Sequence, residues 1–233
     1  MSPTRQSILF ISGAGLPTWI WDQVRELLSS DNPSAVATRP VLPQATLRSY
    51  ARTALANAPA EAFTVVAHSS GGVVAAELLH LAPKRVKGVL EISAVVPHAG
   101  NSYLSALPFP NRLVLSALMR FSGTGPPDAV IRKTLAGHLD PETTTRLLAD
   151  FEPESQHYYR DVVRNFSYPD HLGYVFTTED REVSPKLQRG FLQNLIRVNY
   201  TASLATGHLP MLEDPQGTAQ TVRAFFRAWP GTA

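Results

Sequence analysis

The sequence predicts an α/β fold, with a mostly parallel sheet of about six strands flanked by helices. Short apolar, β-branched segments alternate with segments of helical periodicity along the chain. These apolar segments are continuous, as in strands that are buried on both faces of a sheet. One long region without strand signals interrupts the alternation. A chain of 233 residues suits one domain with a modest insertion.

The N-terminal part of the chain contains most of the predicted elements. Apolar, β-branched runs predict strands at residues 8–11, 35–37, 63–67 and 86–92. Apolar residues at helical spacing predict helices at residues 19–28, 47–56 and 73–81, and Pro83 ends the last of these. The C-terminal part adds strands at 173–177 and 196–200 and a helix at 215–229. The strands therefore number six.

The region 98–168 carries helical patterns only. These patterns cover residues 104–121, 128–138, 141–151 and 154–166, and prolines separate them. The region is too long for a plain connection between a strand and a helix. We therefore expect residues 1–97 and 169–233 to form the core and residues 98–168 to form a helical cap before the penultimate strand.

Composition and charge exclude several classes of function. The formal net charge is +2 and no run of Lys and Arg forms a patch, so we expect no nucleic-acid or membrane partner. The absence of cysteine excludes disulfides, thiolate metal sites and a cysteine nucleophile. No apolar segment approaches the roughly 18 residues that span a bilayer. Residues 1–7 lack the apolar core of a signal peptide, so we expect a cytoplasmic protein.

A catalytic motif lies between the third predicted strand and the helix after it. Ala67-His68-Ser69-Ser70-Gly71 has the small-x-Ser-x-small form of a sharp turn that exposes a nucleophilic serine. Small neighbours are needed because the strand and the helix approach closely there. The start of the helix supplies positive potential, and the backbone N–H of Ser70 is placed to receive an oxyanion. We predict that Ser69 is the nucleophile, with a turn that carries no chemistry as the alternative.

A serine nucleophile needs a base, and His208 is the best placed of the seven histidines. The expected chain order for this type of site is Ser, then acid, then His. Only His208 follows the last predicted strand in a loop, within residues 206–210. His68 lies inside the turn itself. The other histidines precede the last strand, namely His80, His98, His138, His157 and His171.

The acid that orients the base should follow the penultimate strand. Glu179 and Asp180 both lie there. We favour Asp180 because the shorter side chain is the usual partner, whereas Glu179 can face solvent. The other position that serves this purpose follows the strand at 86–92, and residues 93–98 contain no acid.

The loop Ser12-Gly13-Ala14-Gly15 follows the first strand and is the expected source of the second oxyanion donor. Its two glycines let the backbone approach a reacting carbonyl group. A nucleotide-binding glycine loop is the alternative. The loop lacks the G-x-G-x-x-G spacing and the P-loop Lys that such sites require.

Together these segments resemble the α/β-hydrolase superfamily over nearly the whole chain. The closest likeness is to the plant methylesterase and hydroxynitrile lyase group and its bacterial relatives. It rests on residues 9–15 with Trp19 and Trp21, residues 66–72, residues 178–180 and residues 208–212. The resemblance implies a catalytic triad of Ser69, Asp180 and His208. It also implies an oxyanion hole from the backbone N–H groups of Ala14 and Ser70, beneath a small helical cap over a mostly apolar pocket.

The chain departs from the pattern of this group at several positions. Ser12 replaces the usual His before Gly13, and we expect its hydroxyl near the oxyanion hole, so Ser12 and Gly13 are candidate substrate contacts. Ala67 replaces the usual Gly. Leu209 stands where the lyases carry Lys, which favours an esterase over cyanohydrin cleavage and makes Leu209 a third candidate contact.

The resemblance implies a serine hydrolase that acts on a carboxylic ester through an acyl-enzyme. The ester is small or natural-product-like, with methyl esters and lactones included. We expect no metal or organic cofactor, a small-molecule substrate, and a monomer or a homodimer. Some apolar cap residues should line the pocket, from the set Tyr103, Leu104, Leu107, Phe109, Leu113, Leu118, Met119 and Phe121.

Three alternative functions remain open at this point. A type II thioesterase has a similar length and turn, although the expected aromatic-Ala-Gly-Gly loop is missing. A non-hydrolytic tailoring enzyme or lyase would use the same site for elimination or cyclisation. A non-catalytic ligand receptor would keep the fold without turnover.

Overall fold

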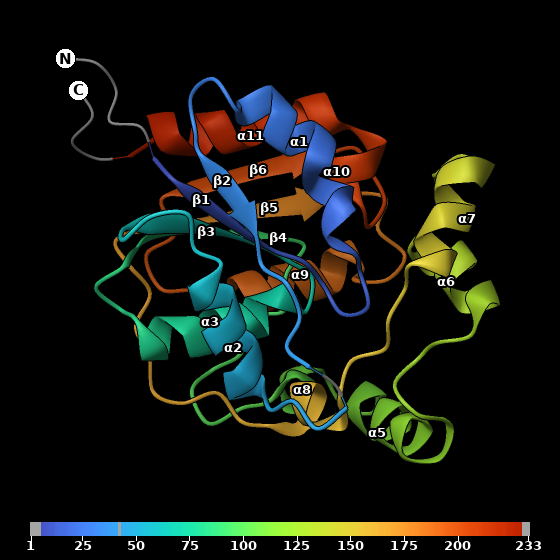
Figure 1. The fold of residues 1–233 in the computed structure, drawn as a ribbon. Coiled ribbons are helices and arrows are strands. Elements are labelled where there is room, and N and C mark those ends of the chain that lie inside the picture. Colours follow the sequence, from blue (N-terminus) through green and yellow to red (C-terminus); the bar gives the residue numbers. More distant parts are fainter. Residues whose placement is uncertain (1–5, 42, 230–233) are drawn as a thin grey trace.

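The computed structural model describes residues 6–41 and 43–229, which form one parallel six-stranded sheet with helices around it (Figure 1). The predicted fold class is therefore confirmed. The strands are β1 (Ile8–Ile11), β2 (Ser34–Val36), β3 (Phe63–His68), β4 (Val86–Ile92), β5 (His171–Thr177) and β6 (Tyr200–Leu204). They lie in the order β2-β1-β3-β4-β5-β6, and all neighbours are parallel. Residues 1–5, which carry most of the signal-peptide prediction, lie outside the described residues.

Helices cover both faces of the sheet, and the side chains of each strand divide between the two faces. Figure 1 shows α1 (Asp22–Leu28) and α11 (Pro215–Arg227) on one face, and α2 (Leu47–Ala56), α3 (Gly71–Leu81) and α9 (Pro185–Leu192) on the other. Ile8 and Phe10 belong to the apolar cluster beneath α1 and α11. Leu9 and Ile11 belong to the cluster beneath α2 and α3. Because successive residues of a strand point to opposite faces, both faces need apolar residues and the strand is a continuous apolar run.

Several predicted boundaries need correction. The last strand begins at Tyr200, because Ile196 is 79% exposed and Arg197 adopts a positive φ of 64°. The helix predicted at 19–28 is divided into a 3-10 helix, η1 (Thr18–Trp21), and α1. The short helix α10 (Pro210–Glu213) and the helix α9 were not predicted. None of the described helices combines the length and apolar character needed to cross a membrane.

Residues 98–168, all of them described, form helices and connecting segments without a strand. The helices are α4 (Tyr103–Ala106), α5 (Asn111–Ser122), α6 (Asp128–Thr134), α7 (Pro141–Ala149) and α8 (Gln156–Arg160). The single helix predicted at 104–121 is two helices, since Pro108 and Pro110 lack the N–H groups that would continue one. The helix predicted at 154–166 ends at Arg160, because Asp161 adopts an extended backbone.

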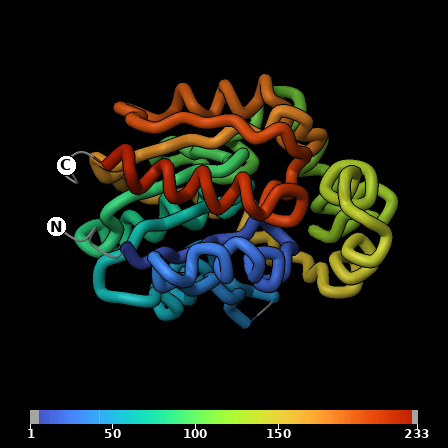
Figure 2. The backbone as a smooth tube through the Cα atoms, turned by 90° about the horizontal axis from the view of Figure 1, so that it is seen from above, coloured from blue at the N-terminus to red at the C-terminus, as the bar shows by residue number. Residues whose placement is uncertain are grey.

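The cap helices lie at the end of the sheet towards which the strands run. Figure 2 shows the segment from α5 to α7 as a separate lobe at that end of the body. Helix α8 lies closer in and contacts α2 and α4. The cap segment is therefore placed beside the carboxyl ends of the strands, where the catalytic motif lies. The division of the chain into a core and a cap domain stays a prediction.

Candidate active site

Ser69 occupies a strained turn between β3 and α3. Its φ of 55° lies in the left-handed region, which costs a non-glycine residue about 1–3 kcal/mol. The strand β4 and the residues after it fix this conformation. The N–H of Ser69 donates to the carbonyl of Ile92 at 3.2 Å, and the carbonyl of Ser69 accepts the N–H of Val95 at 2.9 Å. The turn leaves the Ser69 side chain partly exposed, as a nucleophile requires.

Close backbone approach explains the small residues around Ser69. A Cβ atom at Gly71 would lie 2.7 Å from the carbonyl oxygen of Ile11, and one at Gly72 would lie 2.5 Å from that of Val95. A Cβ atom at Gly13 would lie 2.8 Å from the Cβ atom of Ser69. Each distance is shorter than side chains tolerate, so the turn requires glycine at these three positions. The last distance also shows that the loop after β1 lies directly beside Ser69.

The structure brings Ser69, His208 and Asp180 into one hydrogen-bonded row. His208 Nε2 lies 2.9 Å from Ser69 Oγ, and His208 Nδ1 lies 2.8 Å from Asp180 Oδ2. His208 and Asp180 are buried. Glu179, the competing carboxylate, has a side chain that is 55% exposed and lies 3.6 Å from His138 instead. The arrangement matches that of a nucleophile, a base and an orienting acid.

The Asp180 carboxylate is held in its ionised form. Its Oδ1 atom accepts the N–H groups of Glu182 and Val183, each at 2.8 Å. Its Oδ2 atom accepts the hydroxyl of Thr177 at 2.8 Å in addition to the His208 contact. Burial alone would raise the pKa of Asp180, but the charge of His208 and these hydrogen bonds together lower it below the ordinary value.

The same ion pair raises the pKa of His208. Complete burial disfavours the imidazolium and by itself lowers the pKa of His208. The charge and hydrogen bond of Asp180 act in the opposite direction, and Glu182 and Glu213 add to their effect. The pKa of His208 therefore lies above its ordinary value of 6.5. Asp180 thus increases the basicity of the nitrogen that faces Ser69.

A buried carboxylate and a buried imidazole fix the backbone on both sides of His208. Glu213, in α10, accepts the N–H of Gly207 at 2.6 Å and the N–H of Leu209 at 3.2 Å. His68 Nε2 lies 2.7 Å from the carbonyl oxygen of His208. Burial lowers the pKa of His68 to about 3, so its ring is neutral and donates the Nε2 proton to that carbonyl. Sequence reasoning missed both roles.

The candidate oxyanion and substrate residues lie in several environments. The N–H of Ala14 does not point into an open hole: it donates to the side-chain Oγ of Ser70 at 2.7 Å. The Ser12 hydroxyl accepts the indole N–H of Trp21 at 3.1 Å. The Leu209 side chain is fully buried and belongs to the apolar cluster beneath α1 and α11. The assignment of these residues to oxyanion or substrate binding stays a prediction.

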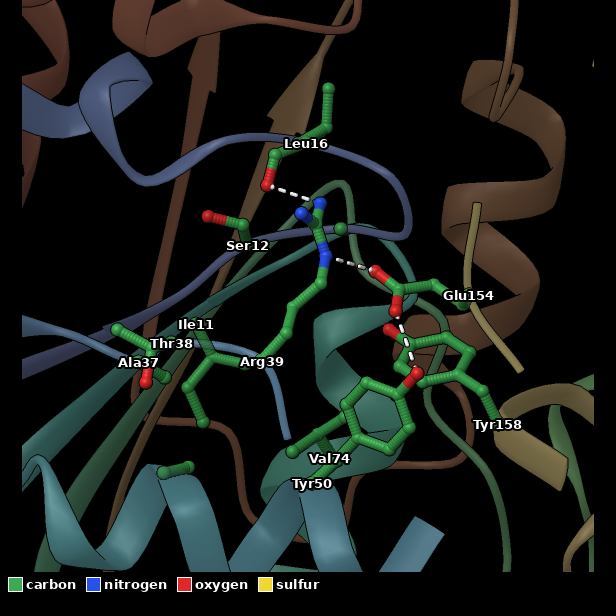
Figure 3. A pocket seen from close by; sticks show the side chains of 12 residues that line it. Ile11, Ser12, Leu16, Ala37, Thr38, Arg39, Tyr50, Val74, Glu154 and Tyr158 are labelled. Atoms are coloured by element: carbon green, nitrogen blue, oxygen red, sulfur yellow. Dashed lines mark hydrogen bonds and ion pairs between the residues drawn. The ribbon is translucent and has the colours of Figure 1, made fainter. Parts of the chain in front are cut away.

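A hydrogen-bond network centred on Glu154, a residue of the cap segment, holds the loop after β1 (Figure 3). Glu154 accepts the N–H of Gly15 at 3.0 Å, the guanidinium of Arg39 at 2.7 Å and the hydroxyl of Tyr50 at 2.7 Å. Arg39 also donates to the carbonyl of Leu16 at 2.9 Å. The cavity beside this network holds about 30 Å³, which is room for one or two water molecules. The network supports the loop, and the cavity is too small for an ester substrate.

The apolar cap residues differ widely in exposure. Leu104 and Met119 are buried, Tyr103 and Leu107 are half-buried, and Phe109, Leu113, Leu118 and Phe121 are 54–84% exposed. Which of them line a substrate pocket stays a prediction. Within residues 6–41 and 43–229, no group of three or more His, Asp and Glu side chains could hold a metal ion.

A strained serine turn on a parallel six-stranded sheet, with a histidine and an aspartate in reach, defines the chain as an enzyme of the hydrolase class. Comparison with known families agrees. The sequence model of the alpha/beta hydrolase family matches residues 8–221, and the chain belongs to this family.

Solved structures with the same fold cover nearly the whole chain. Polyneuridine aldehyde esterase has 16% identity and a TM-score of 0.75, over 95% of this chain and 99% of that one. The pyrethroid hydrolase PytH has 21% identity and a TM-score of 0.74, over 97% and 98%. The methylesterase MES16 from Arabidopsis has 16% identity and a TM-score of 0.72, over 94% and 98%. At these identities the likeness shows the fold. A search of curated proteins finds no match.

Proposed function

We propose that the protein hydrolyses carboxylic esters through an acyl-enzyme formed on Ser69. One observation carries the proposal: a buried His208 lies 2.9 Å from Ser69 Oγ and 2.8 Å from Asp180 Oδ2. That geometry lets one imidazole remove the serine proton while its other nitrogen is held by a carboxylate.

In the proposed reaction, Ser69 Oγ attacks the ester carbonyl carbon and its proton moves to His208 Nε2. The carbonyl oxygen becomes an oxyanion, which accepts the backbone N–H of Ser70 and a second donor beside Ala14. The bond to the alkoxy group then breaks, and His208 returns the proton to the leaving alcohol. Water, activated by His208, attacks the acyl-enzyme and releases the acid.

The proposed substrate is a small or natural-product-like ester, with methyl esters and lactones included. The names of the similar structures, polyneuridine aldehyde esterase, a pyrethroid hydrolase and a methylesterase, support this class. A cytoplasmic location, a monomer or homodimer, and the lack of nucleic-acid and membrane partners stay predictions from the sequence.

Turnover of a substrate panel tests the proposal. The panel contains p-nitrophenyl acetate, a methyl ester, a lactone and an acyl thioester. We expect turnover of the three oxygen esters, the lactone included, to exceed that of the thioester, and to depend on Ser69. Preference for the thioester would indicate a thioesterase, and no hydrolysis by a protein that binds the esters would indicate a receptor; either result contradicts the proposal.

The pKa of His208 predicts the pH dependence of the reaction. Only the neutral imidazole accepts the Ser69 proton, so kcat/KM should fall as the pH drops through the His208 pKa. Because Asp180 raises that pKa, the midpoint of the acid limb should lie above 6.5. A pH–rate profile with p-nitrophenyl acetate measures it. A midpoint at or below 6.5 would contradict the predicted effect of the Asp180 carboxylate.

Glu213→Gln is expected to lower kcat by about 10- to 100-fold, the cost of a misplaced catalytic group. The amide keeps one acceptor oxygen and turns an NH2 group towards the N–H of Gly207 or Leu209. Steady-state kinetics measure the effect, and KM should change much less than kcat. Glu61→Gln is the control, because Glu61 is exposed and precedes β3, at the opposite end of that strand from Ser69. An unchanged kcat would show that Glu213 does not position His208.

A further inference from the structure

The side chain of Ser70 is turned away from the helix that it begins. Ser70 is the N-cap residue of α3, where a serine hydroxyl ordinarily accepts an N–H of the first helical turn. In this protein the Ser70 side chain makes no such bond. It instead accepts the N–H of Ala14 at 2.7 Å and lies 2.9 Å from the hydroxyl of Tyr158, in α8 of the cap.

A count of protons and lone pairs shows what this hydroxyl can still do. A serine hydroxyl has two lone pairs and one proton. The Ala14 N–H uses one lone pair. Tyr158 is the natural donor in the second contact, because a phenol is a stronger acid than an aliphatic alcohol and burial raises its pKa, so it stays protonated. Ser70 then keeps one proton, and no acceptor for it is found in the described part of the chain.

The loop that Ser70 Oγ contacts packs against the nucleophile. Ser70 follows Ser69 directly, and its Oγ atom is within 2.7 Å of the N–H of Ala14. The preceding residue, Gly13, is so close that a Cβ atom there would lie 2.8 Å from the Cβ atom of Ser69. Ser70 is 2% exposed and Tyr158 is also 2% exposed, so water competes little for either hydroxyl.

We propose that Ser70 is a catalytic residue whose hydroxyl donates a hydrogen bond to the oxyanion. The Ser70 backbone N–H is the first oxyanion donor and the Ser70 hydroxyl is the second. The Ala14 N–H acts through Ser70 and does not touch the substrate. Tyr158 is a positioning residue: it donates to Ser70 Oγ and so directs the Ser70 proton to the reacting centre. The inference rests on the proposed function of Ser69, and it makes a cap residue part of the oxyanion site.

Phosphonylation of Ser69 by a fluorophosphonate tests the inference without knowledge of the natural substrate. Ser69 Oγ bonds to phosphorus, fluoride leaves, the serine proton moves to His208, and the phosphoryl oxygen occupies the oxyanion site. The second-order rate constant is measured for the wild type, Ser70→Ala, Tyr158→Phe and the double variant. Tyr159→Phe is the matched control, because Tyr159 is also buried and its ring lies 5.1 Å from that of Tyr158. Thermal melts verify folding of each variant.

We expect Ser70→Ala to lower the rate constant by about 10²- to 10³-fold, as for other single oxyanion donors. Tyr158→Phe should lower it by about 10-fold, the value of one hydrogen bond of about 1.4 kcal/mol. The double variant should be no slower than Ser70→Ala, and Tyr159→Phe should equal the wild type.

Two results would overturn the inference alone. An unchanged or faster Ser70→Ala would show that the Ser70 side chain merely blocks the Ala14 N–H. Additive losses in the double variant would show that Tyr158 does not act through Ser70. If Ser70→Ala fails to fold, a rate for Tyr158→Phe equal to that of Tyr159→Phe overturns the inference. No labelling of Ser69 in the wild type would instead overturn the proposed function, and the inference with it.

Discussion

Ser69→Ala is expected to lower kcat for p-nitrophenyl acetate by about 10⁵-fold or more, the loss seen when a serine nucleophile is removed. Alanine keeps the turn but has no oxygen that can bond to the acyl carbon. The oxyanion donors and His208 remain, so the residual rate should reflect transition-state binding alone. Steady-state hydrolysis at saturating ester measures the effect. Ser29→Ala, at an exposed serine after α1, is the control and should equal the wild type.

A Ser69→Ala variant that retains kcat within about 10-fold would place the chemistry elsewhere, since less than 1.4 kcal/mol would then depend on the hydroxyl. The strain at Ser69 sharpens this test. A φ of 55° is costly for any residue other than glycine, so serine and alanine bear the same backbone cost at position 69. A change in stability between the two proteins should therefore be small.

Asp180→Asn is expected to lower kcat by about 10⁴-fold while the fold is retained. Asparagine has nearly the shape of aspartate, but its amide can donate to His208 Nδ1 and so favour the tautomer with the proton on Nε2. That proton would face Ser69 Oγ, 2.9 Å away, and the imidazole could no longer accept the serine proton. The loss of the negative charge also removes the effect that raises the pKa of His208. The pH–rate profile should therefore show its acid limb at lower pH.

Glu179→Gln is the matched control for Asp180→Asn, because it makes the same chemical change at the neighbouring carboxylate. Glu179 is largely exposed and its carboxylate lies beside His138, whereas Asp180 is the carboxylate that contacts His208. We expect its kcat to stay within about twofold of the wild type, as for a solvent-exposed charge. Equal losses in both variants would contradict the assignment of Asp180 as the orienting acid.

Much of the fold could be predicted because the signals are local. A strand buried on both faces is largely apolar along its length, as β1 and most of β3 are. In β4 the apolar residues are interrupted by Lys87 and Glu91. The β6 prediction was displaced because Ile196 is apolar and yet 79% exposed, so its sequence signal has no structural counterpart. Helix α9 was missed although Ser184-Pro185 is a helix-start signal: the Ser184 side chain caps α9 and Pro185 is its first residue.

The order of Ser69, Asp180 and His208 could be predicted because it follows the order of the strands that carry them. The groups that support these residues could not. Glu154 and Tyr158 reach the site from the cap, and Glu213 reaches it from a helix too short to predict. Their roles depend on side-chain direction, which tertiary packing sets and sequence spacing does not. The contact between Ala14 and Ser70 is of the same kind, since an N-cap serine ordinarily bonds its own helix.

Trapping of the acyl-enzyme tests the central claim most directly. The wild type and Ser69→Ala are mixed with p-nitrophenyl acetate, quenched in acid within the first turnover, digested and examined by peptide mass spectrometry. We expect one acetyl group per chain on Ser69 in the wild type, and none on the corresponding peptide of Ser69→Ala. Hydrolysis of the ester with no acetyl group on Ser69, or with the acetyl group on another residue, would contradict the claim that Ser69 is the nucleophile.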